Sequence, residues 1–213
     1  MSRILRWTFY VLIVRPIIML ILGLNVRHRE RLPTRGPAVL AANHNSHLDA
    51  MVLITLLPIR QLPRVRPVAA MDYFLRNRAL AWFSTRIVGI VPIPRQRSSP
   101  QDDPLSGCSA ALDRGEILIF FPEGSRGEPE QLAEFRGGIA KLADRHPDVP
   151  IIPIYLHGLG KALPKGEAML VPFFLDVFVG DPLHGRDHPG DLRDELRRRL
   201  EVLRDEGSFA PWD

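Results

Sequence analysis

The sequence has a single cysteine, Cys108, so neither a disulfide framework nor a cysteine-rich zinc site can form within the chain. A reducing compartment is therefore the expected setting. Acidic residues are not in excess, since 28 Lys and Arg stand against 24 Asp and Glu and leave a net charge of +4. This charge suits an anionic partner such as a phosphate, a nucleic acid or an acidic membrane surface, and does not choose among them.

Several functional motifs are also missing. No G-x-S-x-G nucleophile elbow occurs, because Glu123 stands where the first glycine before Ser125 would be needed. The histidines form no familiar zinc-ligand array, and no cysteine pair accompanies them, so we predict no metal site. No basic–aromatic repeat or recognition-helix pattern is present, and we predict no nucleic-acid partner.

The length and composition indicate a globular protein rather than a disordered one. The 213 residues are 46% hydrophobic and 24% charged, which is enough to bury a substantial core. No internal repeat or long linker divides the main part of the chain. We predict a membrane-associating segment at residues 1–31 and a single folded domain at residues 32–213.

The N-terminal segment is strongly apolar, but Arg15 and Pro16 interrupt it. The two charge-free pieces, Trp7–Val14 and Pro16–Val26, are both shorter than the roughly 20 residues that cross a bilayer. A re-entrant or interfacial hairpin is the favoured interpretation. Its basic flanks are Arg3, Arg6, Arg27, Arg29 and Arg31. A single crossing kinked at Pro16 and a helix packed on a soluble domain are the alternatives.

From residue 37 onward, short apolar runs alternate with helical patterns. Strands are predicted at 38–43, 66–71, 88–93, 116–122, 149–156 and 173–180. Helices are predicted at 48–57, 73–87, 104–114, 133–146 and 191–205. Continuous apolar strands that alternate with helices are typical of an α/β protein with a mixed, mostly parallel sheet covered by helices. Ligands in such proteins bind beyond the carboxyl ends of the strands, where His44 and Glu123 fall.

The stretch N-H-N-S-H-L-D at 43–49 allows three interpretations. His44, His47 and Asp49 could be metal ligands, but their spacing matches no familiar zinc signature. The asparagines, Ser46 and Asp49 could simply form a turn that caps the next helix. If the chain turns between His44 and Asp49, the carboxylate can instead orient the imidazole as a general base.

Read with the rest of the chain, this stretch resembles the N-H-x4-D motif of the glycerolipid acyltransferases, which include 1-acylglycerol-3-phosphate acyltransferase. Further blocks of that family follow in order. They are G-I-V-P-I-P-R at 89–95, F-P-E-G-S-R-G at 121–127, F-R-G-G at 135–138 and V-P-I-I-P-I-Y-L-H-G at 149–158. Ser125 replaces the usual Thr, Gly127 the usual Ser and Arg136 the usual Lys, so the hydroxyl at 125 and the positive charge at 136 are kept.

The resemblance implies the roles of individual residues. His44 and Asp49 would be catalytic. Substrate binding would fall to Arg95, Glu123, Gly124, Ser125, Arg126 and Arg136. For Glu123, a buried ion pair with a neighbouring arginine is an equal alternative, and for the arginines a solvated surface position is the alternative.

The resemblance also implies an enzyme that moves a fatty acyl group from acyl-CoA or acyl-carrier protein to the hydroxyl of a lysophospholipid in phospholipid synthesis. The expected acceptor is 1-acylglycerol-3-phosphate, with no cofactor besides the acyl thioester. The expected location is the cytoplasmic face of the inner (plasma) membrane, with membrane lipids as partners. A lipid-binding or thioester-hydrolysing protein of the same fold is the alternative.

Overall fold

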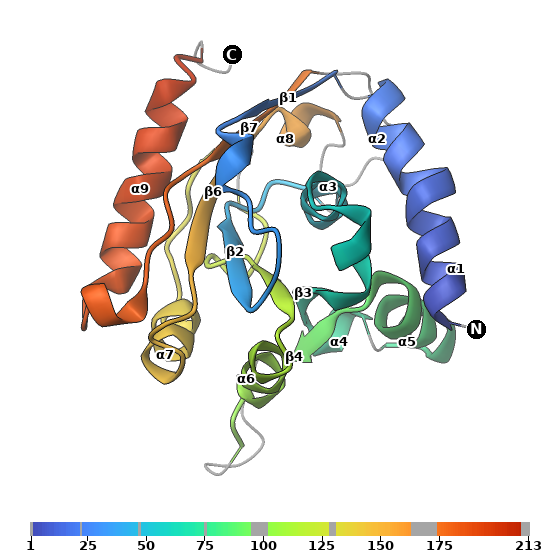
Figure 1. Ribbon diagram of the computed structural model, residues 1–213, viewed down its shortest axis with the longest axis horizontal. Helices are drawn as coiled ribbons and strands as arrows, with labels where there is room; N and C mark the ends of the chain where they lie inside the picture. Colours follow the sequence, from blue (N-terminus) through green and yellow to red (C-terminus); the bar gives the residue numbers. More distant parts are fainter. Residues whose placement is uncertain are drawn as a thin grey trace.

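The computed structural model describes residues 2–21, 23–46, 48–74, 76–94, 102–127, 131–162 and 174–209. Its centre is a seven-stranded sheet in the order β1-β7-β6-β2-β5-β3-β4 (Figure 1). The strands are β1 (Gly23–Arg27), β2 (Ala38–Ala42), β3 (Val65–Ala70), β4 (Val91–Ile93), β5 (Ile117–Phe120), β6 (Ile151–His157) and β7 (Phe174–Val179). All neighbouring pairs are parallel except β6 and β7, so the predicted mixed, mostly parallel α/β sheet is confirmed.

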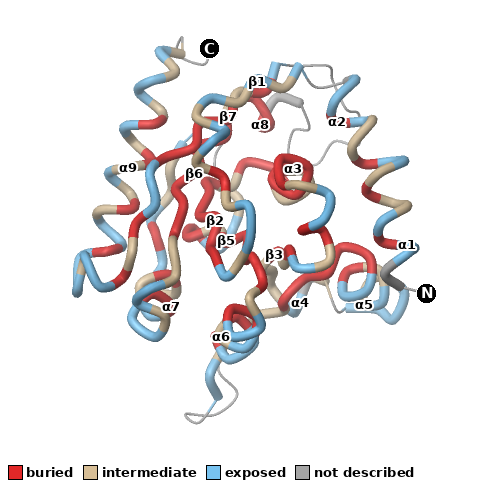
Figure 2. Tube along the Cα trace, viewed as in Figure 1, coloured by how far each residue is buried: buried red, intermediate tan, exposed pale blue. Residues whose placement is uncertain are grey.

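Helices cover both faces of this sheet. Helices α1 (Ser2–Phe9), α2 (Arg15–Ile21) and α3 (Asp49–Leu56) lie on one face, and α6 (Ser106–Asp113), α7 (Gly138–Arg145) and α9 (Leu192–Glu206) lie on the other (Figure 1). Figure 2 shows that the central strands and α3 are buried, whereas the outer sides of α1, α2 and α9 are exposed. Four leucines on one face of the last helix are buried: Leu192, Leu196, Leu200 and Leu203.

Three predicted elements differ clearly from the structure. The helix predicted at 133–146 begins only at Gly138, as α7. The helix predicted at 73–87 is divided into α4 (Met71–Phe74), α5 (Arg78–Phe83) and the π-helix η4 (Ser84–Val88). Asn77 begins α5, because its side chain accepts a hydrogen bond from the Leu80 N–H at 2.8 Å. The strand predicted at 88–93 is shorter, because η4 continues to Val88 and Gly89 then adopts a left-handed conformation with φ of 80°.

The shorter helical elements connect these parts. They are η2 (Arg29–Arg31), η3 (Ile59–Arg64), α8 (Leu159–Ala162) and η5 (Gly185–Asp187).

The predicted N-terminal hairpin is wrong. Helix α1 (Ser2–Phe9), the π-helix η1 (Tyr10–Val14) and α2 (Arg15–Ile21) follow one another without a reversal, and β1 then joins the sheet beside β7. Pro16 comes directly after the π-helical turn η1, whose last hydrogen bond runs from the Arg15 N–H to the Tyr10 carbonyl. Every fourth residue from Tyr10 faces the core, namely Tyr10, Val14 and Ile18. Among the described residues, no helix combines the length and the apolar character that crossing a membrane requires.

Candidate active site

The end of β2 places the first polar residues of the site. Asn43 lies one residue beyond the strand, and its carboxamide pairs with both backbone groups of Leu156 in β6. Asn43 Nδ2 donates to the Leu156 carbonyl at 2.9 Å, and the Leu156 N–H donates to Asn43 Oδ1 at 2.7 Å. The side chain thus continues the β2–β6 hydrogen bonding while the backbone turns away toward His44. Sequence reasoning treated Asn43 only as a turn residue and missed this positioning role.

The turn between His44 and Asp49 brings their side chains into contact. His44 Nδ1 lies 2.8 Å from Asp49 Oδ2, and the same carboxylate oxygen accepts the N–H groups of Asn45 at 2.7 Å and Ser46 at 2.9 Å. Asp49 is fully buried, whereas the His44 side chain is 20% exposed. The carboxylate is therefore fixed inside the protein, and the imidazole reaches the surface of the site. The predicted contact between the two residues is confirmed.

The environment of Asp49 determines the tautomer of His44. Burial raises the pKa of the Asp49 carboxyl, and the hydrogen bonds from His44, Ser46 and Asn45 oppose that rise. Because Oδ2 already accepts the N–H groups of Asn45 and Ser46, we assign the hydrogen of the neutral imidazole to Nδ1 of His44, from which it donates to the same oxygen. Nε2 is then the unprotonated nitrogen and can accept a proton from a substrate.

The turn after β5 packs directly against His44. The ring of Phe121 stacks on the imidazole, with centroids 4.1 Å apart and planes at 17°. The Gly127 N–H donates to the His44 carbonyl at 3.3 Å, which brings residue 126 beside the histidine backbone. Gly124 makes the turn possible, because its φ is 71° and a Cβ there would lie 2.9 Å from Cδ of Arg136.

Glu123 is buried in this turn without a compensating cation. Only 3% of the residue is exposed, and neither carboxylate oxygen has a hydrogen-bond partner among the described residues. Burial raises the pKa of Glu123 to about 7, and the nearby Asp49 charge adds to the rise. The His44 and Ala133 amides, which lie near the carboxylate but outside hydrogen-bond geometry, and Arg197, which lies beyond ion-pair distance, oppose it only in part. The alternative of a buried ion pair with a neighbouring arginine is not observed among the described residues.

This raised pKa predicts that Glu123 makes the protein less stable as the pH rises. Between pH of about 4.5 and about 7 the folded protein binds more protons than the unfolded chain, so the free energy of unfolding falls and then levels off. In urea denaturation at pH 5 and pH 8, Glu123→Gln should gain up to about 3 kcal/mol over the wild type at the higher pH. The exposed Glu134→Gln should show no such gain, and a gain for Glu123→Gln that is equal at both pH values would contradict the titration.

The remaining predicted substrate residues surround the same turn. Ser125 is exposed and Arg126 is half-buried, both one strand away from the end of β2. Arg136 is exposed at the end of the following loop, and its side chain lies against Gly124. The predicted site residue Arg95 lies outside the described residues, as does His47 of the stretch at 43–49.

The two other interpretations of residues 43–49 can now be compared with the geometry. Asp49 accepts backbone N–H groups of the turn before α3, so a polar turn is present together with the His44 contact. The capping part of that interpretation is wrong, because no described side chain accepts a hydrogen bond from the first N–H groups of α3. Within the described ranges, no three His, Cys, Asp or Glu side chains are grouped as metal ligands. The turn and the histidine pair are therefore parts of one arrangement.

Comparisons with known proteins identify the family of the chain. Residues 23–157 match the family model described as Acyltransferase. The chain is 30% identical over 164 residues to a chloroplastic 1-acyl-sn-glycerol-3-phosphate acyltransferase of Arabidopsis thaliana, covering 76% of this chain and 44% of that protein. It is 30% identical over 178 residues to a chloroplastic protein of the same name from Brassica napus, covering 83% and 49%. The chain thus spans about half the length of these curated relatives.

One solved structure shares the fold over almost the whole chain. It is the 1-acyl-sn-glycerophosphate acyltransferase PlsC from Thermotoga maritima, with a TM-score of 0.75 and 17% sequence identity. The match covers 97% of this chain and 81% of that one. The sheet and its covering helices are therefore shared with that protein.

Proposed function

The chain belongs to the acyltransferase family, and on this premise we propose that it transfers a fatty acyl group from an acyl thioester to the free hydroxyl of a lysophospholipid. The proposed acceptor is 1-acylglycerol-3-phosphate, the substrate in the names of its relatives. The proposed donor is acyl-CoA or acyl-carrier protein. The observation that carries the proposal is the 2.8 Å contact of His44 Nδ1 with the buried Asp49, which leaves Nε2 available at the surface of the site.

The proposed reaction needs no enzyme nucleophile, because a thioester is already activated. Nε2 of His44 takes the proton of the acceptor hydroxyl as its oxygen attacks the thioester carbonyl. Asp49 stabilises the imidazolium that results. When the tetrahedral intermediate collapses, the carbon–sulfur bond breaks and the imidazolium returns the proton to the leaving thiolate. The products are the acylated lipid and a free thiol.

The turn after β5 supplies donors for the oxyanion in this proposal. The Gly124 and Gly127 N–H groups are already bonded to the carbonyls of Phe121 and His44. Among the described residues, the N–H groups of Ser125 and Arg126 donate to no backbone carbonyl. These two amides are thus the donors that the oxyanion of the intermediate would use.

Thiol release tests this proposal against its alternatives. Purified protein is mixed with acyl-CoA, with and without 1-acylglycerol-3-phosphate, and the released thiol is measured. Release that depends on the acceptor supports the transferase. Release that is the same without the acceptor would identify a thioester hydrolase, and no release with acyl-CoA or acyl-carrier protein would favour a lipid-binding protein.

Arg126 is the residue that we propose to hold the phosphate of the acceptor. It lies in the turn after β5, next to Gly127, whose N–H donates to the His44 carbonyl. Its planar guanidinium can make paired hydrogen bonds to phosphate oxygens. Arg126→Ala should lower kcat/KM for 1-acylglycerol-3-phosphate by about 10–100-fold, mainly through KM, since one charge-assisted contact is lost. Initial rates at varied acceptor and donor concentrations measure this effect.

The matched variant Arg126→Lys should recover only part of the loss, because lysine offers a point charge. The KM for the acyl thioester should change little in both variants. A loss of kcat for every acceptor with unchanged KM would show that Arg126 acts in the transition state or in folding, and would contradict the phosphate assignment.

We also propose that the enzyme lies peripherally on the cytoplasmic face of the inner (plasma) membrane. The outer side of α1, η1 and α2 exposes large apolar side chains that the core does not cover. The most exposed are Ile4, Leu12, Met19 and Leu20. A helix that buries one face in a protein and exposes apolar side chains on the other is suited to lie in a membrane interface.

Replacing Leu12 and Leu20 together by glutamine should lower the partition of the protein onto vesicles by at least about tenfold, because both side chains leave water on binding. Vesicle flotation measures the bound fraction. Val202→Gln, on the half-exposed position of α9 at the other side of the molecule (Figure 1), is the control and should bind as the wild type does. Equal binding of the double variant would place the membrane contact elsewhere.

A further inference from the structure

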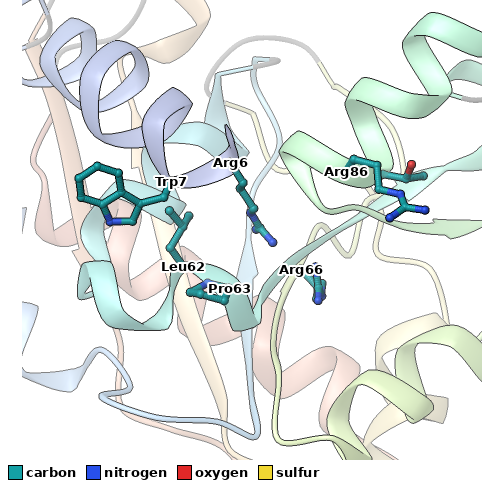
Figure 3. Close-up of a pocket in the computed structure, with 7 residues that line it drawn as sticks. Arg6, Trp7, Leu62, Pro63, Arg66 and Arg86 are labelled. Carbon is teal, nitrogen blue, oxygen red and sulfur yellow. The ribbon is translucent and has the colours of Figure 1, made fainter. Parts of the chain in front are cut away.

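A second cationic site lies far from His44, under the first turns of α1. Here a pocket of about 380 Å³ is lined by residues from three segments of the chain. The lining residues are Arg6, Trp7, Leu62, Pro63, Arg66, Thr85 and Arg86. Figure 3 shows Arg6 and Arg66 between Trp7 on one side and Arg86 on the other. The volume falls in the range of small-molecule sites, about 300–1,000 Å³.

Arg6 is the unusual member of this pocket. It is only 5% exposed, yet among the described residues no carboxylate lies within ion-pair distance of it. One of its nitrogens, Nη2, donates to the Val65 carbonyl at 2.7 Å, and its Nε has no hydrogen-bond partner. Burial lowers the pKa of Arg6 to about 10, so the side chain is still charged at neutral pH. A buried cation without an anion is costly, and a ligand that supplies the anion would offset this cost.

The surrounding residues increase the positive charge rather than neutralise it. Arg66 is bonded to Glu116 at 2.9 Å, but that carboxylate also binds Arg114 at 3.0 Å. Arg86 is exposed, and no carboxylate among the described residues pairs with it. One carboxylate is thus shared by two arginines, while Arg6 and Arg86 are left without one.

The backbone is also shaped around the buried guanidinium. Gly89 has a φ of 80°, and a Cβ at this position would lie 2.5 Å from Nη1 of Arg6. A side chain at residue 89 would therefore displace Arg6 from the wall of the pocket. Gly89, the first residue of the G-I-V-P-I-P-R block, is therefore needed for this site as well as for the turn into β4.

The pocket is separate from the proposed active site. Arg6 binds the carbonyl of Val65, which begins β3 and is level with Ile117 and Ala38 at the starts of β5 and β2. His44 follows the opposite end of β2, about 15 Å or more away at about 3.3 Å per strand residue. The two sites thus lie at opposite ends of the central strands.

We propose that this pocket binds the phosphate of an anionic membrane lipid while α1 lies in the membrane interface. Arginine forks suit phosphate oxygens, and Trp7, which is 47% exposed, lines the pocket next to the exposed apolar side of the helix. Aromatic side chains with this mixture of exposure and burial favour the headgroup level of a bilayer. The site would hold the start of α1 at a fixed depth, and it does not depend on turnover at His44.

Vesicle binding with matched lipids tests this proposal. Neutral galactolipid vesicles carry either phosphatidic acid or oleate at equal surface potential, so only one set offers phosphate. The wild type should bind the phosphatidic acid vesicles about tenfold more tightly than the oleate vesicles. Arg86→Gln, at an exposed position that does not hold the fold together, should lose this preference.

Arg78→Gln is the matched control, because it removes the same charge from the same helical run outside the pocket. It should weaken binding to both vesicles equally and keep the preference for phosphate. Equal binding of the wild type to both vesicles would overturn the proposal. Displacement from phosphatidic acid vesicles by micromolar adenosine 3′,5′-bisphosphate would also overturn it, since the pocket would then bind the nucleotide part of a soluble donor.

Discussion

Replacing His44 by alanine lowers kcat by about 10²–10⁴-fold in the mechanism that we propose, the range expected when a general base is removed. The acceptor hydroxyl would then have to lose its proton to water as it attacks. The KM values for donor and acceptor should change little, because Nε2 acts on the proton that moves and not on the groups that bind. Steady-state thiol release at saturating substrates measures kcat.

His44→Asn separates the loss of the base from damage to the site. The asparagine amide can still donate to Asp49, as Nδ1 of His44 does at 2.8 Å, but it cannot accept a proton at the position of Nε2. This variant should therefore be as inactive as His44→Ala while unfolding at the wild-type urea concentration. Turnover close to that of the wild type in either variant would remove His44 from the mechanism.

Asp49→Asn should lower kcat by about 10²-fold or more, as expected when the charge behind a catalytic imidazole is removed. This substitution is nearly isosteric here. All three donors meet one oxygen, Oδ2, while Oδ1 has no hydrogen-bond partner among the described residues. An asparagine can place its carbonyl oxygen at the Oδ2 position and its amide nitrogen at the other. The hydrogen bonds stay, and only the negative charge that stabilises the imidazolium is lost.

Asp49→Ala provides the contrast. It removes the acceptor for the Asn45 and Ser46 N–H groups as well, and each buried donor left unpaired costs about 1–3 kcal/mol of stability. The alanine variant should therefore lose both activity and stability, whereas the asparagine variant should lose activity alone. If Asp49→Asn keeps wild-type kcat, the carboxylate serves the turn before α3 and not the chemistry.

Most strands of the sheet could be predicted because each is a short apolar run between turn residues. The run at 117–120, for example, is completely buried between two neighbouring strands and carries no polar residue. Strand β1 could not be predicted in this way. Its residues alternate between exposed and half-buried at the edge of the sheet, and they follow directly on an apolar helix. Only the pairing with β7, which lies about 150 residues later in the chain, makes them a strand.

The contact between His44 and Asp49 could be predicted because the two residues are five positions apart and the turn between them is short. The surroundings of the pair depend on distant segments. Leu156 fixes Asn43 from more than 100 residues away, and Phe121 reaches the His44 ring from another strand. Arg6 was expected among the basic flanks of a membrane segment, and its burial against the start of β3 depends on packing that no local pattern contains.

The most direct measurement counts the products of one reaction. With acyl-CoA labelled in its acyl chain and 1-acylglycerol-3-phosphate as acceptor, we expect one molecule of labelled phosphatidic acid for each thiol released. We also expect both products to disappear together in His44→Asn. Thiol release that continues without labelled phosphatidic acid, or that persists undiminished in His44→Asn, would contradict an acyl transfer that depends on His44.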